Sequence, residues 1–291
     1  MRYLYYPGCS LKATGKPYEE SLLPVLAKLG LETPELAEWS CCGATTYMGV
    51  AELQAFALAA RNLALAERAG SHEPTTLIAP CNACYLVLNK AQHYIAENKT
   101  VQQRVSGALE AIGLEYEGKI QVRHPLDVLI NDVGLDAIKK LVTKPLKGMK
   151  VAPYYGCQMV RPYSTFDSQQ NPTSMDQILR ALGAETIDWP LKTRCCGASL
   201  MGTVQDAGMR MSYILLKEAR RCGAQMVATC CPLCQHNLEC YQDAIREAFG
   251  AGAEAPVAYF TQFMGIAMGL GPRELGLARL MKPIQAQAAA V

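Results

Sequence analysis

The sequence predicts an α/β protein of two homologous domains related by internal duplication, each with a small, mostly parallel sheet flanked by helices. The first observation behind this prediction is a cysteine pattern that occurs twice and takes up ten of the thirteen cysteines. The first copy is Cys9, Cys41-Cys42-Gly43 and Cys81-x-x-Cys84; the second is Cys157, Cys195-Cys196-Gly197 and Cys231-x-x-Cys234. Matching cysteines lie 148 to 154 positions apart. A repeat of this length is a whole domain rather than a solenoid unit.

The second observation is that short apolar runs, typical of buried strands, lead into the cysteines. Residues 2–6 and 149–155 precede the first cysteine of each copy, and residues 75–79 and 225–229 precede each CxxC pair. The third observation is helical periodicity between these runs. It predicts helices at residues 18–29, 50–69, 174–182 and 207–222. Alternating strands and helices favour parallel sheets joined by right-handed crossovers.

Each copy also continues beyond its last cysteine. Residues 122–129 and 257–264 both read as a strand followed by a helix. Residues 144–148, Lys-Pro-Leu-Lys-Gly, are the expected linker, which gives an N-terminal domain at 1–147 and a C-terminal domain at 148–291. The residues after Gly271 are weakly apolar, and we expect them to form a surface tail.

Composition excludes several classes of protein. Half of the residues are apolar, 19% are charged and the formal charge is +2, with lysine and arginine scattered along the chain. Nucleic-acid binding normally needs a concentrated basic face, so it is not expected. The N-terminus has no apolar segment of the signal-peptide kind, and no apolar run approaches the 18 residues of a transmembrane helix. We therefore expect a cytoplasmic protein whose thiols serve metal or redox chemistry rather than disulfides.

Five cysteines in each copy favour a metal cluster over a single ion. Structural zinc takes four ligands. Adjacent side chains such as those of Cys41 and Cys42 diverge, so they grip one small ion poorly but can hold neighbouring irons of a larger cluster. A CxxC pair at a helix start directs two sulfurs to one place, where the helix N-terminus favours thiolate. Zinc in one or both sites remains the alternative.

The tandem pattern resembles the cysteine-rich CCG-domain family, and most closely the B subunit of heterodisulfide reductases. The resemblance covers almost the whole chain. Beyond the cysteines, it rests on residues 59–63, 81–85, 122–124, 155–157 and 265–269.

The resemblance implies two noncubane [4Fe-4S] clusters, each held by five cysteines. One ligand set is Cys9, Cys41, Cys42, Cys81 and Cys84, and the other is Cys157, Cys195, Cys196, Cys231 and Cys234. It also implies that a disulfide is cleaved reductively, or formed, between the two clusters, as in a bacterial heterodisulfide reductase-like complex of sulfur metabolism. Electrons would come from two partners of that complex, a C-like iron-sulfur subunit and an A-like flavin subunit. Two other functions stay open: an electron-relay subunit without its own substrate, and a zinc-stabilised scaffold.

Three further residues are candidates for the reaction. His124 titrates nearest neutral pH and could give a proton to a leaving thiolate, although such a histidine is more often a hydrogen-bonded core residue. Lys12 and Arg161 follow the first cysteine of each copy and could attract an anionic disulfide or thiol substrate; their alternative is a solvated loop position. We expect Cys222 and Cys240 to be structural, and Cys231 rather than its neighbour Cys230 to be the ligand.

Overall fold

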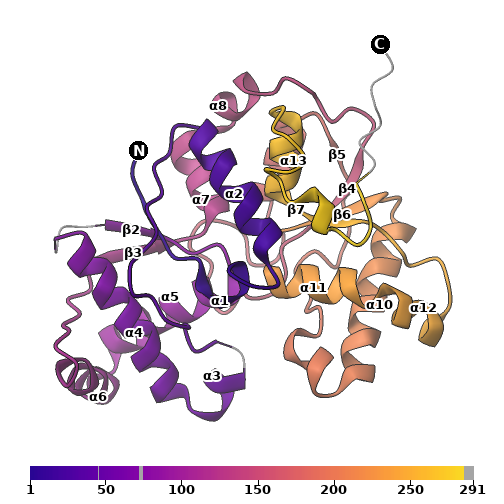
Figure 1. Cartoon of the computed structure of the whole chain (residues 1–291). Coiled ribbons are helices and arrows are strands. Elements are labelled where there is room, and N and C mark those ends of the chain that lie inside the picture. Colours follow the sequence, from indigo (N-terminus) through magenta and orange to yellow (C-terminus); the bar gives the residue numbers. More distant parts are fainter. Residues whose placement is uncertain (45, 72–74, 285–291) are drawn as a thin grey trace.

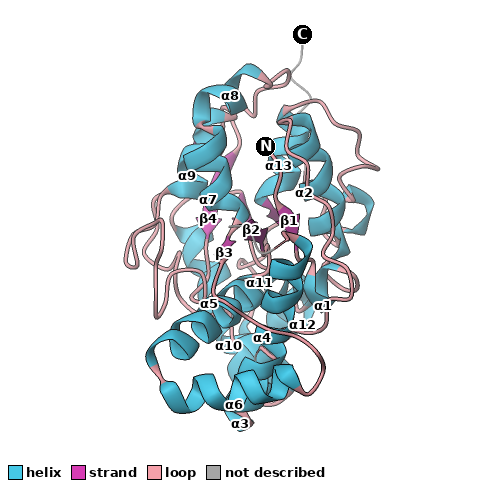
Figure 2. Ribbon diagram, turned by 90° about the vertical axis from the view of Figure 1, so that its left-hand side faces the viewer, coloured by secondary structure: helices cyan, strands magenta, loops and turns pink. Residues whose placement is uncertain are grey.

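The computed structural model describes residues 1–44, 46–71 and 75–284, and its strands form two parallel sheets (Figure 1). The first sheet has the order β1-β2-β3 and the second has the order β5-β4-β6-β7. Figure 2 shows the strands enclosed by helices. The predicted α/β class with two parallel sheets is therefore confirmed.

Among its described residues, the first half has three strands: β1 (Leu4–Tyr5), β2 (Thr75–Ile78) and β3 (Ile120–Arg123). Its helices are α1 (Gly8–Leu11), α2 (Lys16–Lys28), α3 (Thr46–Val50), α4 (Glu52–Ala69), α5 (Asn82–Glu97), α6 (Lys99–Glu110), α7 (Pro125–Val128), the π-helix η1 (Leu129–Val133) and α8 (Leu135–Lys140). Residues 32–35 run parallel to β1 through isolated bridges. Pro34 lies in this segment and has no N–H to donate, so a regular fourth strand is not expected there.

The second half contains four strands: β4 (Lys150–Tyr154), β5 (Glu185–Thr186), β6 (Met226–Thr229) and β7 (Val257–Tyr259). Its helices are α9 (Ser174–Ala181), η2 (Ala198–Gly202), α10 (Gln205–Arg221), α11 (Pro232–Cys240), α12 (Gln242–Phe249), α13 (Phe260–Ala267) and η3 (Leu277–Arg279). The strands and helices predicted from the sequence all exist, with ends that differ by a few residues. The domain boundary at 147/148 stays a prediction.

The two halves are interleaved rather than merely adjacent. Helix α2 of the first half packs along α13 of the second, as Figure 1 shows in indigo and yellow. The hydroxyls of Ser21 and Thr261, from these helices, are hydrogen bonded at 2.6 Å and fully buried. Helix α8 packs on α9 in the same manner. The main hydrophobic core contains residues of both halves.

Most of residues 272–284 lie at the surface, as expected, but the segment is anchored to the fold at buried residues such as Leu275 and Leu280. Leu275 is fully buried, and its carbonyl oxygen accepts a hydrogen bond from Gln262. The backbone N–H of Met281 donates to the buried carboxylate of Glu239 on α11, at 2.8 Å. The weakly apolar sequence after Gly271 gave no indication of these contacts. Residues 285–291 lie outside the described part of the chain.

Candidate functional site

The carboxyl ends of the strands deliver most of the repeated cysteines. Strand β1 leads to Cys9 in α1, and β4 leads to Cys157. Strands β2 and β6 lead to Cys81 and Cys231, which are the N-cap residues of α5 and α11. Because parallel strands end at one edge of a sheet, this connectivity gathers the sulfurs there.

Two tyrosines hold the vicinal cysteine pairs in the same way in both halves. The hydroxyl of Tyr6 donates to the carbonyl oxygen of Ser40, directly before Cys41, at 2.7 Å. The hydroxyl of Tyr154 donates to the carbonyl oxygen of Arg194, directly before Cys195, also at 2.7 Å. Both rings are fully buried. Each vicinal pair is thus anchored to the end of the strand that precedes the first cysteine of its set.

Glycine is required before the first cysteine of each set. Gly8 and Gly156 have φ of +66° and +71°, which L side chains rarely adopt. A Cβ at Gly8 would lie 2.9 Å from Sγ of Cys84, and one at Gly156 would lie 3.0 Å from Sγ of Cys234. These glycines therefore leave room beside a sulfur in each half.

Within each set the sulfurs lie in direct contact. Sγ of Cys42 lies 3.3 Å from Sγ of Cys84. In the second set, Cys157 lies close enough to Cys195, and Cys196 close enough to Cys234, for each thiol to shift the pKa of the other. The N–H of Gly43 donates to Sγ of Cys41 at 3.5 Å, and that of Gly197 donates to Sγ of Cys195 at 3.4 Å.

The two sets also meet each other. Cys81 of the first half lies close to Cys231 of the second, whose thiol is the largest cause of a Cys81 pKa well below the ordinary value. The pKa of Cys195 falls to about 2, chiefly through its hydrogen bond with Cys157. Hydrogen bonds to Cys42 and Cys196 instead hold the pKa values of Cys84 and Cys234 well above the ordinary range. Thiols this close share protons, and metal ions could replace those protons and stabilise the thiolates.

The second set lines a cavity that fits a metal cluster in its donor chemistry. All five of its cysteines line this cavity, together with Gln158, Ala198, Leu233 and, from the first half, Asn82. Among the described residues, no group of three or more His, Cys, Asp or Glu side chains is arranged to hold a single metal ion. Cys9 and Cys41 are exposed and Cys157 and Cys195 half-buried, whereas the other six predicted ligands are buried. Each set therefore has one open side and one closed side.

His124 lies fully buried at the end of β3, where it caps α7. Its Nδ1 accepts a hydrogen bond from the N–H of Leu126, so Nε2 carries the proton and donates to the carbonyl oxygen of Pro80 at 3.1 Å. Burial lowers the pKa of His124 to about 4. These contacts are typical of a hydrogen-bonded core histidine, the alternative role considered from the sequence, and they position the loop before Cys81. Its role as a proton donor stays a prediction.

The two candidate cations lie in different surroundings. Lys12 forms ion pairs with Glu19 and Glu35, both at 2.7 Å. The exposed Arg161 donates to the carbonyl oxygen of Thr193, and its charge contributes to the lowered pKa of Cys195. Arg161 therefore lies near the second set, while two carboxylates balance the charge of Lys12. A substrate role for either residue stays a prediction.

The remaining cysteines have their own partners. The buried Cys230 thiol faces Oδ1 of Asn82, the carbonyl oxygen of Tyr155 and Sδ of Met159. Cys240 lies 3.3 Å from Nδ1 of His236, and Cys222 faces Glu218. Cys230 is buried, whereas Cys222 is half-buried and Cys240 exposed, and the structural roles of Cys222 and Cys240 stay a prediction.

Sequence reasoning missed two asparagines at the site. Asn237 on α11 donates through Nδ2 to Sγ of Cys196 at 3.5 Å and to the carbonyl oxygen of Ala198 at 3.0 Å. Asn82 donates to the carbonyl oxygen of Tyr155 across the two halves, at 2.7 Å. The sequence could have indicated both asparagines, because aligning the two copies pairs Asn237 with Val87 and Asn82 with Pro232, and both pairs differ in polarity.

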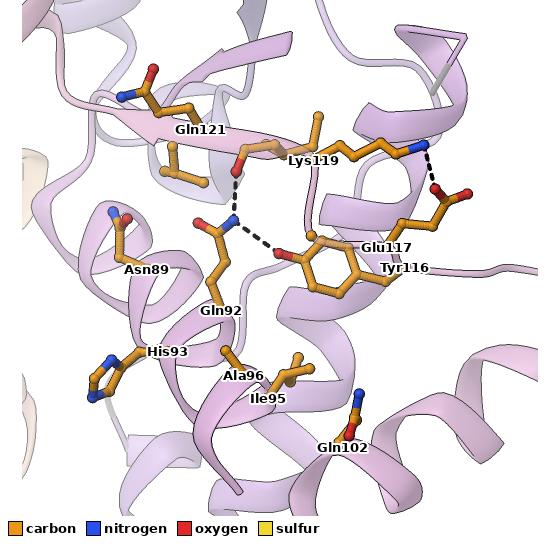
Figure 3. Close-up of a pocket in the computed structure, with 13 residues that line it drawn as sticks. Asn89, Gln92, His93, Ile95, Ala96, Gln102, Tyr116, Glu117, Lys119 and Gln121 are labelled. Atoms are coloured by element: carbon orange, nitrogen blue, oxygen red, sulfur yellow. Dashed lines mark hydrogen bonds and ion pairs between the residues drawn. The ribbon is translucent and has the colours of Figure 1, made fainter. Parts of the chain in front are cut away.

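A larger cavity lies away from the cysteines, between α5, α6 and β3 (Figure 3). Its volume is about 570 Å³. Gln92 crosses it, donating to the hydroxyl of Tyr116 at 2.9 Å and to the carbonyl oxygen of Ile120 at 2.6 Å. Lys119 and Glu117 form an ion pair at its rim. No cysteine lines this cavity, so size alone does not indicate the site.

Comparison with known proteins agrees with the repeat. The family model described as "Cysteine-rich domain" (CCG) matches twice, at residues 3–89 and 151–239. The chain is 32% identical over 277 residues to the 8-methylmenaquinol:fumarate reductase membrane anchor subunit of Wolinella succinogenes, covering 94% of this chain and 95% of that protein. It is 30% identical over 279 residues to the B subunit of the ferredoxin/F(420)H(2)-dependent CoB-CoM heterodisulfide reductase of Methanosarcina acetivorans, with coverage of 94% and 91%.

A solved structure shares the fold. It is a hypothetical protein from Helicobacter pylori that superposes with a TM-score of 0.76 at 16% identity. The match covers 97% of this chain and 52% of that protein, so the chain spans about half of its length. No helix within the described ranges has both the length and the apolar character needed to cross a membrane. With two matched domains, each carrying all five cysteines of its set, the chain belongs to the CCG cysteine-rich domain family.

Proposed function

We propose that this chain is the catalytic iron-sulfur subunit of a heterodisulfide reductase-like complex. It would reductively cleave, or form, a disulfide between two noncubane [4Fe-4S] clusters. The observation that carries the proposal is that Asn82, the neighbour of Cys81, lines the cavity of the second cysteine set, so the two five-cysteine sets lie side by side. Cleavage of RS–SR breaks the S–S bond, consumes two electrons and two protons, and leaves two thiols.

The chain's own residues would bind and enclose the reacting groups. Cys9, Cys41, Cys42, Cys81 and Cys84 would hold one cluster, and Cys157, Cys195, Cys196, Cys231 and Cys234 the other. Such clusters, when bound, supply electrons and Lewis-acidic iron. The buried CxxC pairs exclude water from the closed side of each site. The open side, at Cys9 and Cys41, leaves a route for substrate or partner.

The proposal includes partners inside the cell. The sequence has no Gly-x-Gly-x-x-Gly or Walker motif for a nucleotide cofactor. Electrons would therefore come from a C-like iron-sulfur subunit and an A-like flavin subunit of the same complex. The relatives named as B subunits of heterodisulfide reductases support this assignment.

A second candidate is an electron-relay subunit without its own disulfide substrate. It is favoured by the similarity to a protein named as a subunit of a menaquinol:fumarate reductase. Such a relay would pass electrons between a quinol-linked partner and another protein of the complex. A zinc-stabilised scaffold is the third hypothesis, and it predicts that the protein contains zinc in place of iron.

The test begins with iron, acid-labile sulfide and zinc per chain, measured on protein purified without oxygen. About eight irons with matching sulfide support two four-iron clusters, whereas zinc with little iron contradicts the proposal. The reduced protein is then mixed with organic disulfides or with a menaquinone analogue. Reoxidation by a disulfide, abolished by Cys231→Ala but retained by the neighbouring Cys230→Ala, supports the reductase; reoxidation by the quinone alone supports the relay.

A further inference from the structure

The backbone gives the two cysteine sets the same hydrogen-bond donors. Gly43 and Gly197 donate N–H groups to the first cysteine of each vicinal pair at 3.5 and 3.4 Å. Each CxxC pair lies at a helix N-terminus. These backbone donors therefore do not distinguish the two sites, whereas the side chains around them do.

One side-chain difference is at Asn237. Its amide, 1% exposed, donates to Sγ of Cys196 at 3.5 Å, while its Oδ1 is buried without a hydrogen-bond partner. The repeat places Val87 at this position of α5 in the first half, and Val87 is 2% exposed. Valine has no donor, so the second set receives a side-chain N–H from a position that supplies none to the first set.

A second difference is at the residue after the first CxxC cysteine. Asn82 of the first half lines the cavity of the second set and is fixed there by its hydrogen bond to Tyr155. The equivalent residue of the second half is Pro232, which packs against Gly15 beyond Cys9; a Cβ on Gly15 would lie 2.8 Å from Cβ of Pro232. An amide thus faces the second set from across the boundary, and an apolar ring takes the corresponding place on the first.

The positively charged side chains near the two sets also differ, and this difference too favours negative charge on the second set. The guanidinium of Arg161 donates to the carbonyl oxygen of Thr193, two residues before Cys195. Near the first set, the charge of Lys12 is balanced by Glu19 and Glu35. The second site therefore has more positive potential in its surroundings than the first.

We propose that the two sites are electronically inequivalent, and that a cluster in the second half has the higher reduction potential. Reduction adds negative charge, which N–H groups directed at sulfur and a nearby guanidinium stabilise. This inference rests on the proposed function, since it requires a cluster in each site. Electrons reaching the chain would then collect in the second half first.

The experiment is a redox titration of the full chain, followed by electron paramagnetic resonance, with iron and sulfide measured on each sample. Wild type should be reduced in two separate steps. Asn237→Asp removes the N–H donor at constant size and should lower the higher midpoint potential. Val87→Asn installs an amide in the first site and should raise the lower one. The control is Asn89→Leu, because the Asn89 amide donates at 2.9 Å to the carbonyl oxygen of Tyr85, not to a cysteine sulfur.

The outcomes separate this inference from the proposed function. Two steps, with opposite shifts in the two variants and none in the control, support the inequivalence. Full iron content with one unresolved step, or a shift of the lower step by Asn237→Asp, overturns it and leaves the proposed function standing. A wild-type chain without iron overturns both. If the Asn237→Asp variant loses its iron, the Val87→Asn variant still tests the inference. An unchanged lower midpoint potential in Val87→Asn would contradict it.

Discussion

At the scale of single residues, the site depends on positions where no side chain fits. Gly8 and Gly156 combine a left-handed backbone with a sulfur at the place a Cβ would take. Strain from the backbone alone costs about 1 kcal/mol for alanine. A Cβ at either position would also press against a cysteine sulfur and displace it from the predicted cluster site.

Gly8→Ala should therefore lose the first-half cluster, leaving about four of eight irons per chain. Gly30→Ala is the matched control, because Gly30 has a similar φ of +77° but nothing within 4 Å of its Cβ position. Iron analysis of both variants tests the point. Equal iron in the two variants would show that the sulfur contact is unimportant.

The buried His124 predicts a dependence of stability on pH. Burial lowers its folded pKa to about 4 from 6.5, so only the unfolded chain gains a proton as the pH falls from 6.5. The free energy of unfolding should drop by about 3 kcal/mol between pH 6.5 and 4, and this contribution is fully present above pH 6.5.

Asparagine can cap α7 without titrating, so His124→Asn should have a shallower slope over this range. Denaturant unfolding of both proteins at several pH values gives the difference, in which other acid-sensitive groups cancel. Parallel slopes for the two proteins would contradict the assignment of a neutral, buried ring.

At the scale of elements, each half places an aromatic ring on the other. Tyr18 stacks on Tyr259 with centroids 4.4 Å apart, and Phe166 stacks on His124 at 6.4 Å, both with parallel rings. Tyr18 and Phe166 each lie nine residues after the first cysteine of their set. His124 and Tyr259 each end the last strand of the opposite half and cap its next helix. Each repeat thus supplies one ring that stacks on the other repeat.

Tyr18→Leu keeps an apolar side chain but removes the stack, and should cost about 2–4 kcal/mol of unfolding free energy. Because the ring lies between the halves, iron should be lost from both sites. Tyr213→Leu is the control, since Tyr213 stacks on Phe249 within the second half. Loss of iron from one half only, after Tyr18→Leu, would show that the stack does not couple the sites.

The elements were largely predictable from the sequence, while contacts between them were not. Buried strands such as residues 75–79 and helices such as residues 50–69 follow from local periodicity, which a single segment carries. The repeat also predicted strands that lead into Cys81 and Cys231. Nothing local encodes how close these two cysteines lie, because that depends on how the two domains dock. The anchoring of the segment after Gly271 was not predicted either, because it depends on the contacts of Leu275 with Gly265 and Gln262 of α13.

At the scale of the whole molecule, the cysteines differ in how close they lie to the boundary between the halves. Cys42 contacts Cys84 of its own set, whereas the thiol of Cys81 is influenced most by Cys231 of the other set. Cys42→Ala should lose the first-half cluster and keep about four irons. Cys81→Ala should also change the spectrum of the second-half cluster. An unchanged second-half spectrum in Cys81→Ala would mean that the sites are independent.

The interleaving of the halves has a consequence for biogenesis. Ser21 and Thr261, which join α2 to α13, are 240 positions apart in the chain. Translation proceeds at about 5–20 residues per second, so the first half waits many seconds on the ribosome for the residues that enclose it. During that interval α2 lacks the packing partner α13 that covers it in the complete fold. We therefore expect the N-terminal site to hold iron stably only after the C-terminal half has been made.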